Sequence, residues 1–182
     1  MHLAVVPVLH GSTEAAWRLY GRAFDDLRVL AVQRHIMHRP EFDALMADDR
    51  VNKYLVTDDD GALAAVATMT NDLFAVPLIS PEYFEHRWPL LYAKRRVWYV
   101  SFVAVDPAYQ NRGVMQLVVD RMCTEPTGEE GGVICLDACE YRETAQHLPA
   151  AIERQANRTS PGVTRVRLDS QVYWGYEFPT PA

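Results

Sequence analysis

The stretch from Val97 to Met122 constrains the fold of this chain most, because it predicts a strand, a polar loop and a helix in direct succession. Residues 97–105 are β-branched or aromatic almost throughout, and such a continuously apolar run predicts a central strand buried on both faces. Pro107 ends the strand, since proline cannot donate to a ladder and favours an extended residue before it. After Gly113 the apolar residues recur about every 3.6 positions, which indicates a helix.

The loop at residues 106–113 has the properties of an anion-binding site. Its successive backbone N–H groups precede a helix N-terminus, where the helix dipole favours negative charge. Arg112 adds a full positive charge, and Gly113 lets the backbone approach a ligand without a Cβ in the way. The loop therefore predicts a site for a phosphate or a pyrophosphate.

The segment from Val103 to Met115 resembles the acyl-CoA-binding motif of the GCN5-related N-acetyltransferase (GNAT) superfamily, which is written Gln/Arg-x-x-Gly-x-Gly/Ala. Gln110, Arg112 and Gly113 fit the pattern, whereas Met115 occupies the final position, where the family prefers Gly or Ala. The resemblance implies that the cofactor is acetyl-CoA or another acyl-CoA. The alternative is an ordinary connection between a strand and a helix in another α/β domain.

The same resemblance assigns the cofactor-binding residues. It implies that the pantetheine arm of the cofactor pairs with the backbone of the central strand at Val103, Ala104 and Val105. It places the rest of the cofactor against the loop and the start of the helix, at Gln110, Asn111, Arg112, Gly113, Val114 and Met115.

Composition indicates a single globular domain over residues 1–182. The chain is 49% hydrophobic and 23% charged, which is typical of folded soluble proteins. Its formal charge of −6 argues against nucleic acid as a partner, because phosphate binding needs clustered Lys and Arg. An acidic surface favours a cationic amine. No apolar run approaches the ~20 residues that span a bilayer, and the start lacks the features of a signal peptide, so we expect no membrane association and a cytoplasmic location.

The side chains that commonly bind metals form no evident site in the sequence. Cys123, Cys135 and Cys139 lack the paired spacing of a zinc site, and free or buried thiols are the preferred interpretation. His35 and His38 stand one helical turn apart, but no third ligand accompanies them. We therefore expect no metal.

The first part of the chain follows the order of elements that the family uses. Residues 3–9 predict an edge strand, residues 13–30 an amphipathic helix, and residues 40–46 a second helix that opens on proline. Residues 51–57 and 62–70 predict two strands, which the Asp-Gly ending of their connection joins as a hairpin.

Residues 71–94 depart from that plan, because the family usually has a short turn at this point and this chain has an aromatic-rich insertion. Ser80 and Pro81 predict the start of a helix, and Pro89 predicts its end or a kink. We interpret the insertion as a wall or lid of the acceptor site or as a contact in a homodimer. The competing interpretation is that it covers one face of the sheet.

The last third of the chain predicts a buried strand at residues 132–138, a helix at 143–156, and two further strands at 164–168 and 172–178. In the family the first of these strands splays away from the central one. The expected fold is therefore an α/β (α+β) domain of the GNAT type. Its mixed, mostly antiparallel sheet would have about six to seven strands, flanked by helices, with splayed central strands.

The resemblance implies direct transfer of an acyl group from a thioester to an amine in one ternary complex. Such a reaction needs a base for the amine and an acid for the leaving thiolate. The family often places a carboxylate in or near the central strand, but residues 97–105 contain none, so the candidate bases are Asp137, Glu140 and a water held by the backbone. The family commonly uses a tyrosine on the following helix as the acid. Tyr141 lies just ahead of that helix, and Tyr173 and Tyr176 lie in the last predicted strand.

Three hypotheses of function remain open. The first is an N-acetyltransferase that acts on a small-molecule or peptide amine. The second is an enzyme similar to acyl-homoserine-lactone or N-acyl-amino-acid synthases, whose longer acyl chain the apolar residues 71–94 would suit. The third is a non-catalytic acyl-CoA-binding module that has lost the acid and the base. Cys139 as an acyl-accepting nucleophile is a further, disfavoured alternative.

Overall fold

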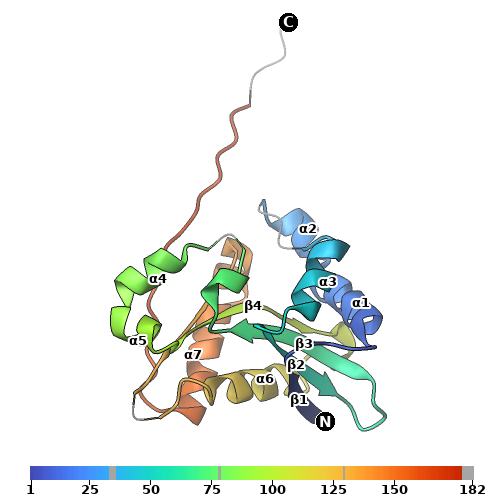
Figure 1. Ribbon diagram of the computed structural model, residues 1–182. Helices are drawn as coiled ribbons and strands as arrows, with labels where there is room; N and C mark the ends of the chain where they lie inside the picture. Colours follow the sequence, from blue (N-terminus) through green and yellow to red (C-terminus); the bar gives the residue numbers. More distant parts are fainter. Residues whose placement is uncertain (33–35, 78, 129, 178–182) are drawn as a thin grey trace, which may run out of the picture.

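Five strands form one sheet in the computed structural model, which describes residues 1–32, 36–77, 79–128 and 130–177. The strands follow one another across the sheet in chain order (Figure 1). The first four pair antiparallel, and the fifth pairs parallel with the fourth. They are β1 (His2–Val6), β2 (Asn52–Thr57), β3 (Leu63–Thr70), β4 (Val97–Val105) and β5 (Val133–Leu136).

Helices cover both faces of this sheet (Figure 1). One face carries α1 (Thr13–Phe24), α2 (Leu27–Leu30) and α3 (Arg39–Ala47) at one end, and η1 (Leu73–Ala75), α4 (Pro81–Arg87) and α5 (Pro89–Ala93) at the other. The opposite face carries α6 (Val114–Cys123) and α7 (Leu148–Thr159). Two short elements, η2 (Pro107–Tyr109) and η3 (Tyr141–Ala145), follow β4 and β5. The mixed α/β class and the mostly antiparallel sheet are as the sequence predicts.

Two cores hold β3 and β4 between the helix layers. On the α1 side, the ring of Tyr20 lies 4.9 Å from Phe102 and 5.2 Å from Phe42, measured between centroids, and these three side chains are buried. On the α6 side, Val118 and Met122 pack with Val100 of β4. Because successive side chains of a strand point to opposite faces, β4 needs apolar residues throughout, which explains its continuous apolar run.

The hairpin predicted at residues 51–70 is confirmed. Asp58 N donates to Ala62 O at 2.9 Å and closes the turn, while Asp58 Oδ1 accepts from Ala62 N at 2.8 Å. Gly61 has a φ of +83°, a conformation that glycine adopts without strain. The helix starts predicted at Pro81 and after Arg39 are also present, with proline in the first turn of each.

The sheet has five strands where the sequence predicts six to seven. Residues 164–168 and 172–177 are extended but form no strand, and residue 178 lies outside the described residues. Alternating side chains make a segment able to pair, but a strand forms only where a neighbouring edge accepts its backbone hydrogen bonds. Among the described residues, no strand pairs with the outer edge of β5.

Two predicted helices are divided. The helix predicted at residues 13–30 is divided after Phe24, and bonds that span three residues, such as that from Arg28 N to Asp25 O at 3.3 Å, tighten the chain at the start of α2. The helix predicted at 143–156 instead consists of η3 and α7. His147 has a φ of +51° between them, and Pro149 falls in the first turn of α7, where its missing N–H costs nothing.

Candidate functional site

The central strands separate at one point, as the resemblance to the GNAT superfamily implies. The pairing of β4 with β5 ends at Val100 and Leu136, whereas β4 continues to Val105 along β3. A bulge between Thr68 and Met69 leaves Ser101 without an opposite residue on β3. We call the point where the pairing of β4 with β5 ends the vertex. Beyond it, one edge of β4 has no strand beside it in the described chain.

The backbone groups on that edge belong to alternate residues. Asp106 N donates to Ala64 O of the β3 side at 2.9 Å. Since the N–H and C=O groups of a strand face its two neighbours alternately, Ala104 presents its groups to β3, and Val103 and Val105 present theirs to the open side. An extended ligand with amide groups can therefore pair with β4 there, as another strand would.

The loop after β4 is held at two places. Asp106 is buried and accepts hydrogen bonds from Ala108 N at 3.0 Å and from Arg22 Nε of α1 at 3.2 Å. Burial raises the pKa of Asp106, but its bonds to Arg22 and Ala108 outweigh burial and hold the pKa below its usual value. At the other side, Tyr109 Oη donates to Asp58 Oδ2 at 2.5 Å, which raises the pKa of Tyr109 and lowers that of Asp58. The loop is thus fixed to α1 and to the β2–β3 turn.

The start of α6 points free backbone donors at this loop. Leu117 N makes the first intrahelical bond, to Gly113 O at 3.0 Å, so the N–H groups of Val114, Met115 and Gln116 have no acceptor within the helix. Gly113 has a φ of +78°, and a Cβ there would meet nothing nearer than Gln116 Oε1 at 3.8 Å. Glycine is therefore favoured at position 113 because another residue would be strained in the left-handed conformation, and not because a Cβ would clash with a neighbouring atom.

The remaining loop residues are open to solvent. Gln110, Asn111, Arg112 and Gly113 are exposed, Met115 is half-buried, and Val114 is buried against the sheet. The guanidinium of Arg112 lies 5.6 Å from the centroid of the Tyr109 ring. A cation and several unused N–H groups at a helix N-terminus are suited to a phosphate or pyrophosphate.

Asp137 lies at the vertex. It is the first residue beyond the paired part of β5, and its Oδ1 accepts a hydrogen bond from Tyr99 Oη at 2.9 Å. Tyr99 is buried, with 7% of its surface exposed, and burial together with Asp137 raises the pKa of its hydroxyl. The carboxylate of Asp137 is exposed. A buried donor thus orients a solvent-accessible carboxylate where the strands part.

Sequence analysis assigned no role to Tyr99, because in an apolar strand a tyrosine resembles any other core residue. A usable signal was present, since a buried tyrosine hydroxyl needs a partner, and Asp137 is a carboxylate near the end of the neighbouring strand predicted at residues 132–138.

The other candidate catalytic residues follow Asp137 in the chain. Glu140 is exposed, while Cys139 and Tyr141 are half-buried. Tyr141 begins η3, and the next residue, Arg142, lies 3.5 Å from Asp26 Oδ1, just ahead of α2. This ion pair joins η3 to the connection between α1 and α2.

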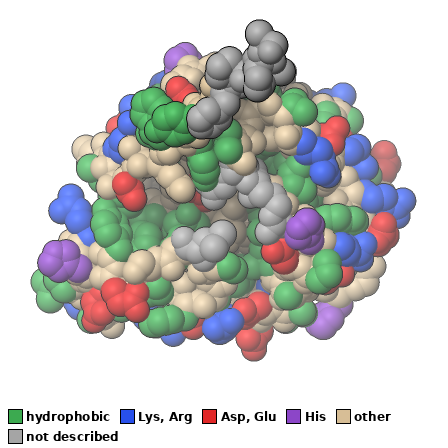
Figure 2. Space-filling view, turned by 90° about the horizontal axis from the view of Figure 1, so that it is seen from above, with side chains coloured by type: hydrophobic (Ala, Val, Ile, Leu, Met, Phe, Trp, Pro, Cys, Tyr) green, Lys and Arg blue, Asp and Glu red, His purple; other side chains and the backbone are tan. Residues whose placement is uncertain are grey.

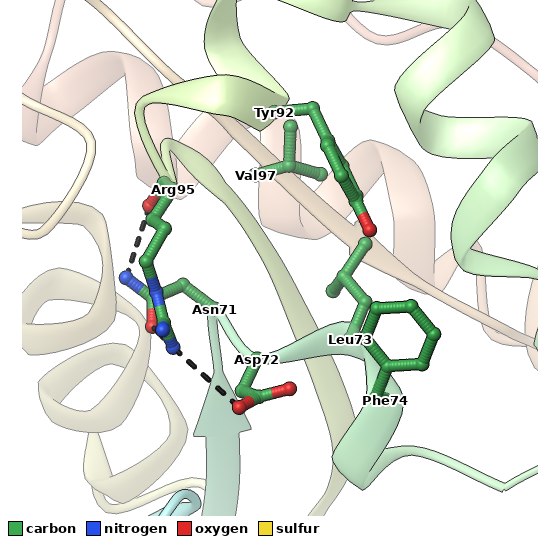
Figure 3. Close-up of a pocket in the computed structure, with 7 residues that line it drawn as sticks. All are labelled: Asn71, Asp72, Leu73, Phe74, Tyr92, Arg95 and Val97. Carbon is green, nitrogen blue, oxygen red and sulfur yellow. Dashed lines mark hydrogen bonds and ion pairs between the residues drawn. The ribbon is translucent and has the colours of Figure 1, made fainter.

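The insertion at residues 71–94 folds back on its own ends. Arg95 bonds to Asn71 and lies 3.7 Å from Asp72, and these residues line a pocket of about 200 Å³ (Figure 3). The pocket lies at the start of β4, at Val97, rather than at the vertex. A second pocket, of about 460 Å³, places Arg22 and Arg28 beside Pro107 at the start of the loop.

Among the described residues, no group of three or more His, Cys, Asp or Glu side chains has an arrangement that would hold a metal ion. Of the two histidines that stand one helical turn apart in the sequence, His35 and His38, the first lies outside the described residues. No helix in the described ranges is both long enough and apolar enough to cross a membrane.

Known structures with low sequence identity share this fold. A mutant of the BH1408 protein from Bacillus halodurans is 12% identical, with a TM-score of 0.58 over 96% of this chain and 99% of that one. The aminoglycoside 6'-N-acetyltransferase AAC(6')-Ih from Acinetobacter baumannii is 12% identical, with a TM-score of 0.55 over 98% and 100%. An aminoglycoside acetyltransferase, HMB0005, from an uncultured soil metagenomic sample is 16% identical, with a TM-score of 0.53 over 96% and 100%.

Comparison of sequences identifies a family for this chain but no individual relative. No curated protein sequence matches this chain. The model of the acetyltransferase (GNAT) family matches residues 13–149, a range that contains the splayed strands, the loop and the start of α6. The chain therefore belongs to the GNAT family of acetyltransferases.

Proposed function

We propose that this protein is an N-acetyltransferase that moves the acetyl group of acetyl-CoA directly to a primary amine. The observation that carries the proposal is the edge of β4 at Val103 and Val105, which no strand of the described residues pairs with and which leads into an anion-binding loop at the N-terminus of α6. Membership of the GNAT family supports the same reaction.

The residues of this site fit the two halves of coenzyme A. The backbone groups of Val103 and Val105 match the amides of a pantetheine arm, which is an extended chain. The N–H groups of Val114 and Met115, together with the charge of Arg112, match the pyrophosphate. When bound, acetyl-CoA supplies a thioester whose carbonyl carbon is electrophilic.

Asp137 is the general base of the proposed mechanism. Its exposed carboxylate takes a proton from the attacking amine, directly or through one water, while the hydrogen bond from Tyr99 holds the carboxylate in place. As the amine nitrogen bonds to the carbonyl carbon, the carbon–sulfur bond breaks. The departing thiolate takes its proton from the hydroxyl of Tyr141, the proposed acid, and Glu140 is the alternative base.

The acceptor approaches from the face that carries α1 to α5. Asp137 follows Cys135 by two residues and accepts a hydrogen bond from Tyr99. Cys135 and Tyr99 both belong to the hydrophobic cluster that includes Phe84 of α4. Figure 2 looks down on this face, where hydrophobic side chains are interspersed with charged ones. The formal charge of −6 suits a cationic small-molecule or peptide amine, and a cytoplasmic location suits acetyl-CoA as donor.

Acetyl rather than long-chain transfer is the preferred reaction. A long acyl chain needs a deep apolar tunnel, and neither of the two pockets described above is one, because charged side chains line both. The insertion therefore gives no specific support to a synthase of the acyl-homoserine-lactone type.

Calorimetric titration with acetyl-CoA tests the cofactor site. We expect micromolar binding by the wild type and loss of binding by Gly113→Trp, whose indole would occupy the space in front of the loop. Gly11→Trp is the matched control, because Gly11 has a similar φ of +75° with nothing within 4 Å of a Cβ. Equal binding by both variants would place the cofactor elsewhere, and binding of only long-chain acyl-CoA would favour the second hypothesis.

Release of free thiol over a panel of amines tests catalysis. We expect Asp137→Asn to reduce turnover at least a hundredfold, and Tyr141→Phe to reduce it less, with unchanged affinity for acetyl-CoA in both. Binding of acetyl-CoA without turnover of any amine would favour the non-catalytic module.

A further inference from the structure

The pocket at the start of β4 places a carboxylate and a guanidinium side by side (Figure 3). Its volume is about 200 Å³. The described residues that line it come from two segments, 71–74 and 92–97, which begin and end the connection between β3 and β4. The mechanism proposed above uses none of these residues, so the pocket is without a role in that reaction.

The carboxylate of Asp72 has no hydrogen-bond donor among the described residues. Its side chain is only 23% exposed, and although Asp72 precedes η1, it makes no capping hydrogen bond there. Its one ion-pair partner within the described ranges is Arg95, and the 3.7 Å between Asp72 Oδ2 and Arg95 Nη2 is longer than a hydrogen bond. Because a largely buried carboxylate normally accepts hydrogen bonds, Asp72 is suited to a donor from a ligand.

Arg95 has an unusual backbone conformation that keeps its guanidinium at the pocket. Its φ is +54°, a left-handed value that is uncommon outside glycine and is concentrated at functional sites. Asn71 holds it twice: Asn71 Nδ2 donates to Arg95 O at 2.9 Å, and Arg95 Nη2 donates to Asn71 Oδ1 at 3.2 Å. A guanidinium has five N–H groups, so within the described chain most of its donors remain available to an anionic group.

The opposite wall of the pocket is apolar and aromatic (Figure 3). Tyr92 and Phe74 supply rings there, and Leu73 and Val97 add buried aliphatic groups. Phe74 is 70% exposed, so a ligand with an apolar side chain would remove much of its ring from water. Binding sites for small molecules commonly combine such an apolar wall with a few polar groups that fix the orientation of the ligand.

We infer that this pocket binds a free α-amino acid with an apolar or aromatic side chain, whose ammonium pairs with Asp72 and whose carboxylate pairs with Arg95. In such a molecule one carbon atom carries both charged groups. Their charges are therefore adjacent and complementary to those of Asp72 and Arg95, and the side chain faces Tyr92 and Phe74. A residue within a peptide does not fit in this way, because it lacks both charges.

The bound amino acid is not the acceptor of the proposed reaction. Val97 of the pocket precedes Val100 at the vertex by three residues, which is roughly 10 Å along a strand, whereas attack on a thioester needs reacting atoms about 3 Å apart. An ammonium paired with Asp72 also has no lone pair for attack. The pocket is therefore a second ligand site, and the inference does not depend on acetyl transfer.

Calorimetric titration of the full-length protein with L-phenylalanine and with L-leucine tests the site. We expect one molecule to bind per chain, with a dissociation constant on the order of 1 mM or below. Phenethylamine lacks the carboxylate and hydrocinnamate lacks the ammonium, so each should bind at least about tenfold more weakly than L-phenylalanine. Equal binding of either analogue would overturn the inferred recognition of both charges.

Two variants each remove one charge from the pocket. Asp72→Asn removes the partner of the ammonium. Arg95→Gly removes the guanidinium and introduces a residue that adopts the positive φ without strain. Each should weaken the binding of L-phenylalanine at least about tenfold, and circular dichroism confirms that each is folded. Asp60→Asn, at an exposed aspartate of the β2–β3 turn, is the matched control and should bind as the wild type does.

Asp137→Asn separates this pocket from the vertex. We expect this variant to bind L-phenylalanine as the wild type does, and loss of binding in it alone would place the amino acid at the vertex and overturn the inference. Absence of binding to the wild type at about 10 mM amino acid, or equal binding by the wild type, Asp72→Asn and Arg95→Gly, would also overturn it. These titrations contain no acetyl-CoA, so their outcome is independent of the proposed function.

Discussion

Lys53 is a fully buried lysine, and its replacement by methionine makes the most quantitative prediction from this structure. Its Nζ donates to Pro7 O and Val51 O at 2.7 Å each, and to Asp48 O. These carbonyls lie after β1 and before β2, so one ammonium group joins the ends of two neighbouring strands. Lys53→Met keeps the length of the side chain and removes the donor.

The cost follows from the carbonyls that lose their donor. Asp48 O also accepts from Val51 N at 3.2 Å, so two carbonyls, those of Pro7 and Val51, are left unsatisfied. A buried acceptor without a partner costs about 1–3 kcal/mol, and relief from burying a charge offsets part of this. We expect Lys53→Met to lower the free energy of unfolding by about 3 kcal/mol, or the melting temperature by about 6–12 °C.

The pH dependence gives a second test of the same substitution. Burial lowers the pKa of Lys53 to about 8, against the opposing effects of Asp48 and Asp49. Because the folded pKa lies below the unfolded value of about 10.4, the unfolded state binds more protons between these values. Stability from Lys53 therefore rises with pH in that window.

Urea unfolding of wild type and variant at pH 7 and at pH 10 measures both effects. The difference in free energy of unfolding between the two proteins should be about 3 kcal/mol at pH 7 and larger at pH 10. The titration of all other groups is common to both proteins and cancels in this difference. A difference below about 0.5 kcal/mol would refute the role of the three bonds. A difference that narrows with pH would show that the bonds to the ammonium outweigh the cost of its burial.

Three further substitutions test the site and its support. Asp106→Asn should weaken acetyl-CoA binding several-fold by calorimetry. Because the pKa of Asp106 is depressed, its contribution to stability should disappear as pH falls below the usual aspartate range; unchanged acid unfolding would contradict this. Gly132→Ala should cost about 1–3 kcal/mol in urea, since its Cβ would lie 2.7 Å from Trp98 Cζ3, and should not alter cofactor affinity; a neutral effect would mean that this contact yields. Tyr99→Phe should lower turnover about tenfold without changing acetyl-CoA affinity, and an unchanged rate would remove Tyr99 from the orientation of Asp137.

Local chemistry made the strand, loop and helix at residues 97–123 predictable. The period of the apolar residues changes from a continuous run to a helical one, and Pro107 and Gly113 mark the boundaries. The β2–β3 hairpin was equally accessible, because Asp58 and Gly61 form its turn from neighbouring residues. In each case the determining interactions lie within a few positions along the chain.

Tertiary structure decided which groups meet. Tyr99 and Asp137 are 38 positions apart, and Arg22 and Asp106 are 84 apart, so no local pattern indicates these pairs. The number of strands in the sheet is likewise decided by tertiary structure. Residues 164–168 alternate and residues 172–178 are rich in aromatic side chains, and both patterns predict strands. A strand nevertheless requires a free edge in reach, and only the arrangement of the other elements determines where such an edge lies. Sequence thus specified most of the elements and the loop between β4 and α6, and the packing of distant elements specified the oriented carboxylate and the C-terminal arm at residues 163–177, which forms no strand among the described residues.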